Sequence, residues 1–128
     1  MAARRPVLIV EDNPETRDVI QRVLEISGYE AAAATDGLEA IDFLRAATDD
    51  ALPEVILLDL RMPNMDGWTF LEALRREPRF TDIQVIIFSA DPDTHTVPGV
   101  LGWIRKGSTD PDVLLALLRQ AYGEKPGK

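Results

Sequence analysis

The chain contains 128 residues with a formal net charge of −8, no cysteine, 45% hydrophobic residues and 28% charged residues. These values are typical of a single globular domain with its own core, and the lack of cysteine excludes disulfides and thiolate metal sites. No apolar run approaches the roughly 20 residues needed to span a bilayer. The acidic balance, with no basic stripe, argues against direct nucleic-acid binding. We expect one cytoplasmic domain over residues 1–128, with a core from about 6 to 122 and a tail at 123–128.

The first expected element is a strand, PVLIV, that stops at Glu11 and Asp12. A continuous apolar run of this kind is typical of a strand buried on both faces in a parallel sheet. A helix is expected next, with Asn13 as its N-cap, Pro14 at its first position and Gly28 suited to its C-terminal end. The apolar stripe of this helix is expected to consist of Val19, Ile20, Val23, Leu24 and Ile26.

Strand and helix patterns alternate along the rest of the chain. The further expected elements are a strand at 29–34, a helix at 38–47, a strand at 54–60, a helix at 68–76, a strand at 84–90, a strand at about 101–105 and a helix at 111–122. This alternation predicts a single α/β domain with right-handed crossovers. We expect a doubly wound, five-stranded parallel sheet of order 2-1-3-4-5, as in flavodoxin-like folds.

Each clear strand in this pattern ends in polar side chains. Glu11 and Asp12 follow the first strand, Asp59 ends the third, Ser89 ends the fourth and Lys106 follows the fifth. The carboxyl ends of parallel strands share one edge, and strands one and three are neighbours at the switch point where such sheets bind ligands. One polar strand end alone would mean little. Four strand ends whose polar side chains suit the same chemistry predict a site at which the three carboxylates converge.

The residue types at this edge indicate phosphoryl chemistry. Three close carboxylates repel one another unless a cation joins them, and oxygen ligands without histidine or cysteine suit Mg²⁺. Lys106 can pair with a carboxylate or a phosphoryl oxygen, and Ser89 offers a hydroxyl donor. Positioning and charge neutralisation of this kind serve phosphoryl transfer. Asp59 is the expected nucleophile, forming an acyl phosphate.

Four segments, VLIVEDNPETR, VILLDLRMPNMDGWTFL, VIIFSA and WIRKG, resemble the motif blocks of response-regulator receiver domains, in the same order. The resemblance extends from about Val7 to Ala121. It implies a signalling phosphoacceptor that catalyses only its own phosphorylation and slow dephosphorylation. The implied phosphodonor is a histidine kinase or a histidine phosphotransfer protein, and the output is a conformational change read by a downstream protein.

The resemblance also implies roles for individual residues. Asp59 is the phosphoacceptor. Asp12, Asp59 and the backbone carbonyl of Arg61 hold Mg²⁺, and Glu11 contributes through water. The remaining implied roles are phosphoryl-oxygen binding by Ser89 and Lys106 and switching by Ser89 and Trp103, the latter at a position where the family has Tyr or Phe.

The chain departs from the family pattern in two places. Gly107 replaces the proline that usually follows the lysine in a cis peptide bond, so we expect this loop to be trans or mobile. Only 16 residues separate Ser89 from Lys106. Residues 90–97 make at most about two helical turns and are rich in Asp, Thr and Pro. We therefore expect a shortened or missing fourth helix.

Three other functions fit the sequence less well. A pseudo-receiver, which binds a partner without being phosphorylated, is favoured by the changed lysine loop but opposed by the complete set of acids, hydroxyl and lysine. A phosphohydrolase on a similar sheet needs a second acid two residues after the nucleophile, where Arg61 stands. A nucleotide-binding domain needs a glycine-rich turn after the first strand, and EDNPET contains no glycine.

Overall fold

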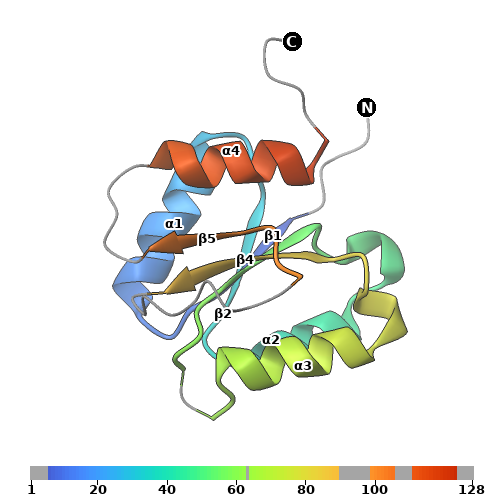
Figure 1. The fold of residues 1–128 in the computed structure, drawn as a ribbon. Helices are drawn as coiled ribbons and strands as arrows, with labels where there is room; N and C mark the ends of the chain where they lie inside the picture. Colours follow the sequence, from blue (N-terminus) through green and yellow to red (C-terminus); the bar gives the residue numbers. More distant parts are fainter. Residues whose placement is uncertain (1–5, 63, 90–98, 106–110, 124–128) are drawn as a thin grey trace.

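The structure is a computed structural model that describes residues 6–62, 64–89, 99–105 and 111–123. Its centre is a five-stranded sheet of order β2-β1-β3-β4-β5, and every neighbouring pair of strands is parallel (Figure 1). The predicted strand order is confirmed. The strands are β1 (Val7–Val10), β2 (Ala31–Ala34), β3 (Val55–Leu58), β4 (Gln84–Ser89) and β5 (Gly102–Arg105).

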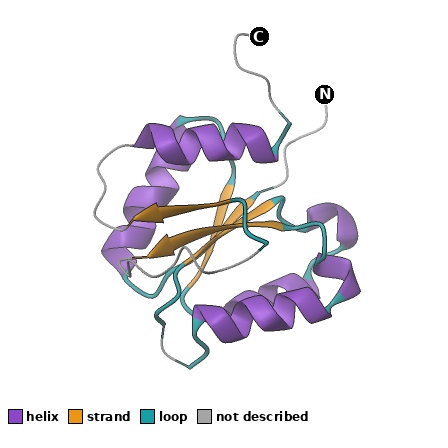
Figure 2. Cartoon of the chain, viewed as in Figure 1, coloured by secondary structure: helices purple, strands orange, loops and turns teal. Residues whose placement is uncertain are grey.

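Helices cover both faces of the sheet. The helices are α1 (Pro14–Ile26), α2 (Gly37–Ala46), α3 (Gly67–Arg76) and α4 (Pro111–Ala121), with short 3-10 turns η1 (Asp49–Ala51) and η2 (Pro78–Phe80). Figures 1 and 2 show α1 and α4 on one side of the sheet and α2 and α3 on the other. None of the helices in the described ranges is long and apolar enough to cross a membrane.

The segment in which we expected a shortened or missing fourth helix lies between β4 and β5. Residues 99–101, the described part of this connection, contain no helix. Residues 90–98 and 106–110 lie outside the described residues, and with them Lys106 and Gly107. The fourth-helix expectation therefore stays a prediction.

The apolar residues of the sheet supply two core layers. Leu8 and Val10 belong to the layer that includes α2 and α3, whereas Val7 and Ile9 belong to the layer that includes α1 and α4. Because helices cover both faces, all four residues are 0% exposed. This double burial explains why the strand sequence is continuously apolar instead of alternating.

Helix α1 starts as the sequence predicts, but its buried stripe is narrower. Asn13 is the N-cap, and its side chain accepts a hydrogen bond from the backbone N–H of Thr16 at 3.0 Å. Among the expected stripe residues, Val19 and Ile26 are 62% and 85% exposed, so their inclusion was wrong. The helix packs on the sheet through Ile20 and Leu24, which lie four residues apart on one face.

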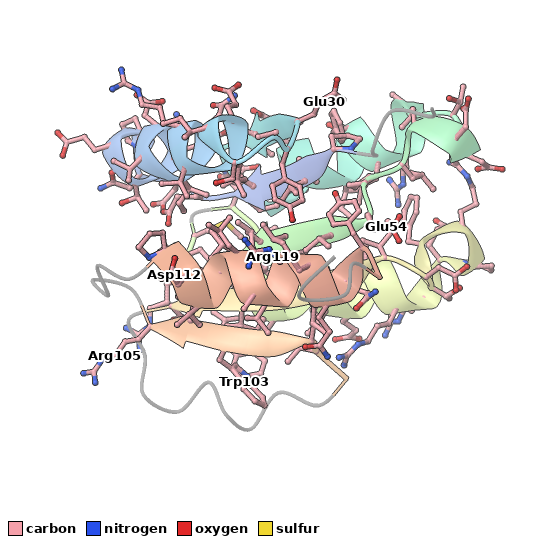
Figure 3. The ribbon with its side chains drawn as sticks, turned by 90° about the horizontal axis from the view of Figure 1, so that it is seen from above. Glu30, Glu54, Trp103, Arg105, Asp112 and Arg119 are labelled. Atoms are coloured by element: carbon pink, nitrogen blue, oxygen red, sulfur yellow. The ribbon has the colours of Figure 1, made fainter. Side chains whose placement is uncertain are left out.

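Strand β5 forms one edge of the sheet and is buried on one face only. Gly102 and Ile104 are buried, whereas Trp103 and Arg105 are exposed. Figure 3 shows the side chain of Trp103 projecting from β5 away from α4. Its exposed fraction of 36% leaves the indole partly accessible to solvent.

The N-terminus of α3 lies directly against the end of β3. The backbone N–H of Gly67 donates to the carbonyl oxygen of Leu60 at 2.9 Å. A Cβ atom on Gly67 would lie 2.6 Å from the carbonyl oxygen of Asp59 and 2.6 Å from the Cα of Leu60. Backbone atoms cannot move aside as a flexible side chain can, so this contact requires glycine.

Replacing Gly67 with Ala should lower the free energy of unfolding by about 1–3 kcal/mol, because the added methyl collides with the backbone of Asp59 and Leu60, directly after β3. Alanine favours the helix over glycine by about 1 kcal/mol, so helix propensity alone would raise the stability. A decrease in stability can therefore be attributed to the collision. Urea denaturation measures the change. Gly102→Ala is the matched control, because the three atoms nearest to its Cβ would all belong to the movable side chain of Leu117, the nearest at 3.0 Å. Equal stability of Gly67→Ala and wild type would show that the contact with Asp59 and Leu60 does not require glycine.

Candidate functional site

Backbone pairing brings the first and third strand ends together. The backbone N–H of Asp59 donates to the carbonyl oxygen of Val10 at 3.1 Å, and that of Glu11 donates to the carbonyl oxygen of Ala34 at 3.1 Å. Val10 pairs with Leu58 in the parallel register of β1 and β3. Glu11 and Asp59 each follow that pair, so they lie side by side at the carboxyl edge of the sheet.

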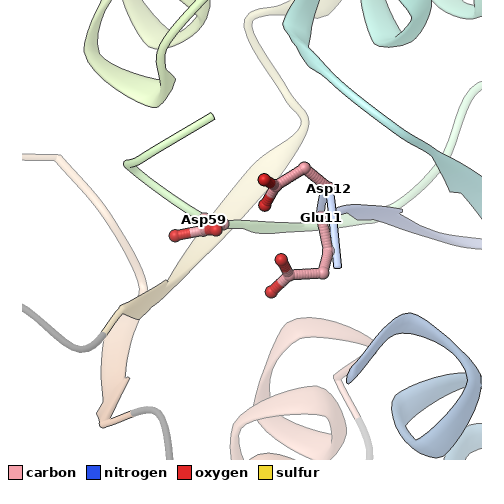
Figure 4. A group of neighbouring side chains, drawn as sticks. All are labelled: Glu11, Asp12 and Asp59. Atoms are coloured by element: carbon pink, nitrogen blue, oxygen red, sulfur yellow. The ribbon is translucent and has the colours of Figure 1, made fainter. Parts of the chain in front are cut away.

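Three acidic side chains meet at this edge. Glu11, Asp12 and Asp59 each offer a carboxylate oxygen, and these oxygens lie within 4.8 Å of one another. Figure 4 shows the carboxylates of Glu11 and Asp12 directed toward the side on which Asp59 lies. Glu11 and Asp59 are 1% and 3% exposed, whereas Asp12 is exposed. The cluster thus has a buried base and one open side, as a site for an exchangeable ion requires.

Backbone amides and one arginine support the acids. The Oε2 atom of Glu11 accepts from the backbone N–H of Asn13 at 3.0 Å, and the Oδ1 atom of Asp59 accepts from the backbone N–H of Arg61 at 3.2 Å. The guanidinium Nη1 of Arg17 donates to the carbonyl oxygen of Glu11 at 2.8 Å and of Asp12 at 3.4 Å. These groups bring positive partial charge and one full charge next to the carboxylates, which lowers their mutual repulsion.

Of the other predicted site residues, some have a defined position in the structure and one lies outside the described residues. Ser89 ends β4 and is 3% exposed. Leu58 pairs with Ile87, so Ser89 lies two residues beyond that pair at the same edge. Arg61 is exposed in the loop after Asp59. Trp103 lies in β5, and Lys106 lies outside the described residues.

The donor chemistry of the cluster fits a hard divalent cation. The three side chains offer oxygen atoms only, the ligand type that Mg²⁺ and Ca²⁺ prefer. With few protein ligands and an exposed side, the cluster leaves positions on such a cation that waters or other oxygen ligands could fill. A bound cation would also reduce the electrostatic repulsion between carboxylates that lie this close together.

Sequence reasoning missed two supporting contacts. It singled out neither Arg17, whose guanidinium reaches back from α1 to the carbonyl oxygens before that helix, nor the hydrogen bond from Asn64 to Asp36 beside the Asp59 loop. The position of Arg17 in the sequence weakly indicates its contact, because an arginine one turn into a helix can reach the preceding loop. Asn64 and Asp36 are 28 residues apart, and no local pattern pairs them.

Comparison with known proteins agrees with this geometry. The family model of the response regulator receiver domain matches residues 7–116. The chain belongs to this family. Its function is that of a receiver domain of two-component systems, for which a phosphoacceptor role is standard.

Named relatives and solved structures point to the same family. The chain is 36% identical over 84 residues to the DNA-binding dual master transcriptional regulator RpaA of Synechocystis sp., covering 66% of this chain and 33% of RpaA. It is 35% identical over 80 residues to the sensor histidine kinase CheAY of Helicobacter pylori, covering 62% of this chain and 10% of CheAY. A response regulator receiver protein from Pseudomonas putida has a TM-score of 0.82 at 27% identity, covering 94% of this chain and 99% of the other.

The receiver domain spans at most about a third of the two curated relatives. Those relatives therefore carry further segments to which this chain has no counterpart in the match. The family model, which matches residues 7–116, includes the acidic cluster.

Replacing Arg17 with Ala should lower the free energy of unfolding by about 1–2 kcal/mol, because the carbonyl oxygen of Glu11 loses a charged donor. Chemical denaturation measures the loss. Arg22→Ala, on the exposed surface of the same helix, is the control and should change stability by less than about 0.5 kcal/mol. An Arg17→Ala protein as stable as the Arg22→Ala protein would contradict the supporting role.

Proposed function

We propose that Asp59 of this receiver domain is the residue that accepts the phosphoryl group, with a divalent cation bound beside it. The observation that carries the proposal is the convergence of three carboxylates around the end of the central strand β3. Asp59 is the member of the cluster at that strand end, held by the backbone N–H of Arg61. A buried, oriented carboxylate next to a cation site is suited to attack phosphorus.

The proposed reaction transfers a phosphoryl group from a phosphohistidine. A carboxylate oxygen of Asp59 forms the new P–O bond, and the P–N bond of the donor breaks. The histidine ring nitrogen leaves with the bonding electron pair and takes up a proton. The product is an acyl phosphate, which water later hydrolyses to regenerate the carboxylate and release inorganic phosphate.

We assign the cation as Mg²⁺, held by the carboxylates of Asp12 and Asp59 and the backbone carbonyl of Arg61, with Glu11 acting through water. The support is the all-oxygen donor set, with oxygens within 4.8 Å of one another. When bound, the ion supplies neutralisation of the charge on the phosphoryl oxygens. Glu11 and Asp12 are themselves positioned by the carbonyl contacts of Arg17.

Two further residues are proposed to bind the phosphoryl group. Ser89 offers a buried hydroxyl at the end of β4, and Lys106 follows β5 in the sequence. We assign Ser89 and Trp103 as the switch that reports the new charge at Asp59. The exposed fraction of Trp103, 36%, supports this assignment, since a partly exposed indole can change its packing at lower cost than a fully buried one.

The proposed setting is a phosphorelay. The donor is a histidine kinase or a histidine phosphotransfer protein, and the domain acts as a signalling phosphoacceptor that catalyses only its own phosphorylation and slow dephosphorylation. The net charge of −8 supports an output through a protein and not through direct nucleic-acid contact. A cytoplasmic location, supported by the lack of cysteine, and a receiver core over about residues 6–122 belong to the same proposal.

Asp12→Ala should weaken Mg²⁺ binding at least about tenfold, because it removes one of few protein ligands from the site. A Mg²⁺ titration followed by tryptophan fluorescence measures the affinity, expected in the micromolar-to-millimolar range. Asp18→Ala, which removes the same charge from the exposed surface of α1, is the control and should bind as wild type. If Asp12→Ala and Asp18→Ala bind Mg²⁺ equally well, the metal assignment is wrong.

Asp59→Asn should abolish acid-labile phosphate incorporation while preserving the fold, because the amide has nearly the same shape but is not a competent nucleophile. Its stability without metal should rise slightly, since one of three crowded charges is removed. Labelling with acetyl phosphate and Mg²⁺ tests the first point and urea denaturation the second. Asp66→Asn is the control, because asparagine can still cap α3 there.

The outcome also separates this function from its main alternative. Labelling of wild type and Asp66→Asn but not of Asp59→Asn supports the assignment. Undiminished labelling of Asp59→Asn would place the nucleophile elsewhere. No labelling of the wild-type protein by either acetyl phosphate or a phosphohistidine donor would indicate a pseudo-receiver that works without phosphorylation.

A further inference from the structure

The loop that follows Asp59 is attached to the start of α2. The side-chain Nδ2 of Asn64 donates to Oδ2 of Asp36 at 2.7 Å. Met65 adds a close contact, because a Cβ atom on Gly37 would come within 2.9 Å of both the Cγ and the carbonyl oxygen of Met65. One side-chain hydrogen bond and one tight packing contact therefore connect the loop to the first turn of α2.

Asp36 uses its two carboxylate oxygens for different partners. Its Oδ1 accepts from the backbone N–H of Glu39 at 2.9 Å and caps α2, while its Oδ2 accepts from Asn64. The Glu39 amide, and after it the Asn64 side chain, hold the pKa of Asp36 below its ordinary value. Asp36 is thus a carboxylate at neutral pH, and its bond to Asn64 is charge-assisted and stronger than a neutral one.

The backbone of Asn64 supports a specific role for its side chain. Its φ of 66° lies in the left-handed region, and it is the one non-glycine residue of the described ranges with a positive φ. Glycine would adopt this conformation most readily, and asparagine is among the residues that tolerate it. Asparagine also provides the amide that reaches Asp36, which glycine lacks.

The same loop carries atoms of the phosphorylation site. The backbone N–H of Arg61 donates to Oδ1 of Asp59, and the loop closes where the N–H of Gly67 donates to the carbonyl oxygen of Leu60. These contacts hold the loop at its two ends. Asn64 holds it between them, three residues after Arg61, through its bond to α2.

We propose that Asp36 and Asn64 are positioning residues for metal binding: their hydrogen bond holds the loop so that the carbonyl of Arg61 and the carboxylate of Asp59 face the cation. This inference rests on the proposed function, since it concerns the cation at the same site. Metal ligands must be held to within about 0.5 Å for a productive geometry. A carbonyl in an exposed loop reaches that precision only if the loop is attached to a rigid element.

Two substitutions separate the hydrogen bond from the other roles of these residues. Asn64→Gly keeps the left-handed backbone but removes the amide donor. Asp36→Ser keeps an N-cap for α2 but removes the oxygen that receives Asn64. Each should raise the Mg²⁺ dissociation constant about three- to tenfold, below or at the lower end of the range for direct partners of metal ligands. The double variant should resemble either single one, because both remove the same bond.

Glu39→Ala is the matched control. Glu39 accepts from the N–H and hydroxyl of Thr35 at 3.2 Å and 3.0 Å, so its loss weakens the start of α2 but leaves the Asp36–Asn64 bond in place. The full chain is titrated with Mg²⁺, and circular dichroism and thermal unfolding without metal are recorded for each variant. A purely structural role predicts lower melting temperatures with unchanged Mg²⁺ affinity, and a general effect of α2 predicts that Glu39→Ala also loses affinity. Either result would overturn the proposal.

Failure of this inference is distinguishable from failure of the proposed function. If wild type binds Mg²⁺, Asp12→Ala does not, and Asn64→Gly and Asp36→Ser bind within twofold of wild type, the positioning role is wrong and the metal site stands. If wild type and Asp12→Ala bind Mg²⁺ equally weakly, the metal site itself is wrong. Weaker binding by both positioning variants, with Glu39→Ala unchanged, supports the inference.

Discussion

The repulsion among three carboxylates whose oxygens lie within 4.8 Å of one another is the constraint on which the site depends. In an unfolded chain Glu11 and Asp59 would stay apart. The parallel pairing of β1 with β3 forces them together, because each follows a pair of residues fixed in the ladder. The energy for this comes from burial of the strands between two helical layers, where each fully buried Val, Leu or Ile contributes about 1.5–3 kcal/mol.

The surroundings of the acids reduce this repulsion without removing it. Backbone N–H groups of Asn13 and Arg61 and the guanidinium of Arg17 bring positive charge close to the cluster. We propose that such a site receives a divalent ion and then the negative phosphoryl group. Any ligand that binds only the folded form also stabilises it, so occupancy of the site and stability of the domain are thermodynamically linked.

Loops carry the chemistry here, and rigid elements determine their position. The loop after Asp59 is held at its ends by backbone contacts and in the middle by the bond from Asn64 to Asp36. Because residue 67 is glycine, α3 starts in direct contact with the backbone of Asp59 and Leu60. The residue of the acidic cluster at the end of β3 is thus next to the helical layer formed by α2 and α3. β5 is the edge strand beyond β4, and its Trp103 is 36% exposed. Under the proposed function, a charge added at Asp59 would have to be passed on through β4 to reach this edge.

The sequence by itself determined the strand order, the helix starts and the acidic cluster, because these depend on local features: apolar runs that end in acids, caps such as Asn13 before Pro14, and motif blocks along most of the chain. Only the tertiary structure decided which helix residues are covered and which distant side chains meet. Val19 has the apolar character of a core residue yet is exposed, since the width of a buried stripe depends on how closely a helix lies on the sheet. Asn64 meets Asp36 across 28 residues only because two loops reach the same sheet edge, and no periodicity within either segment encodes that contact.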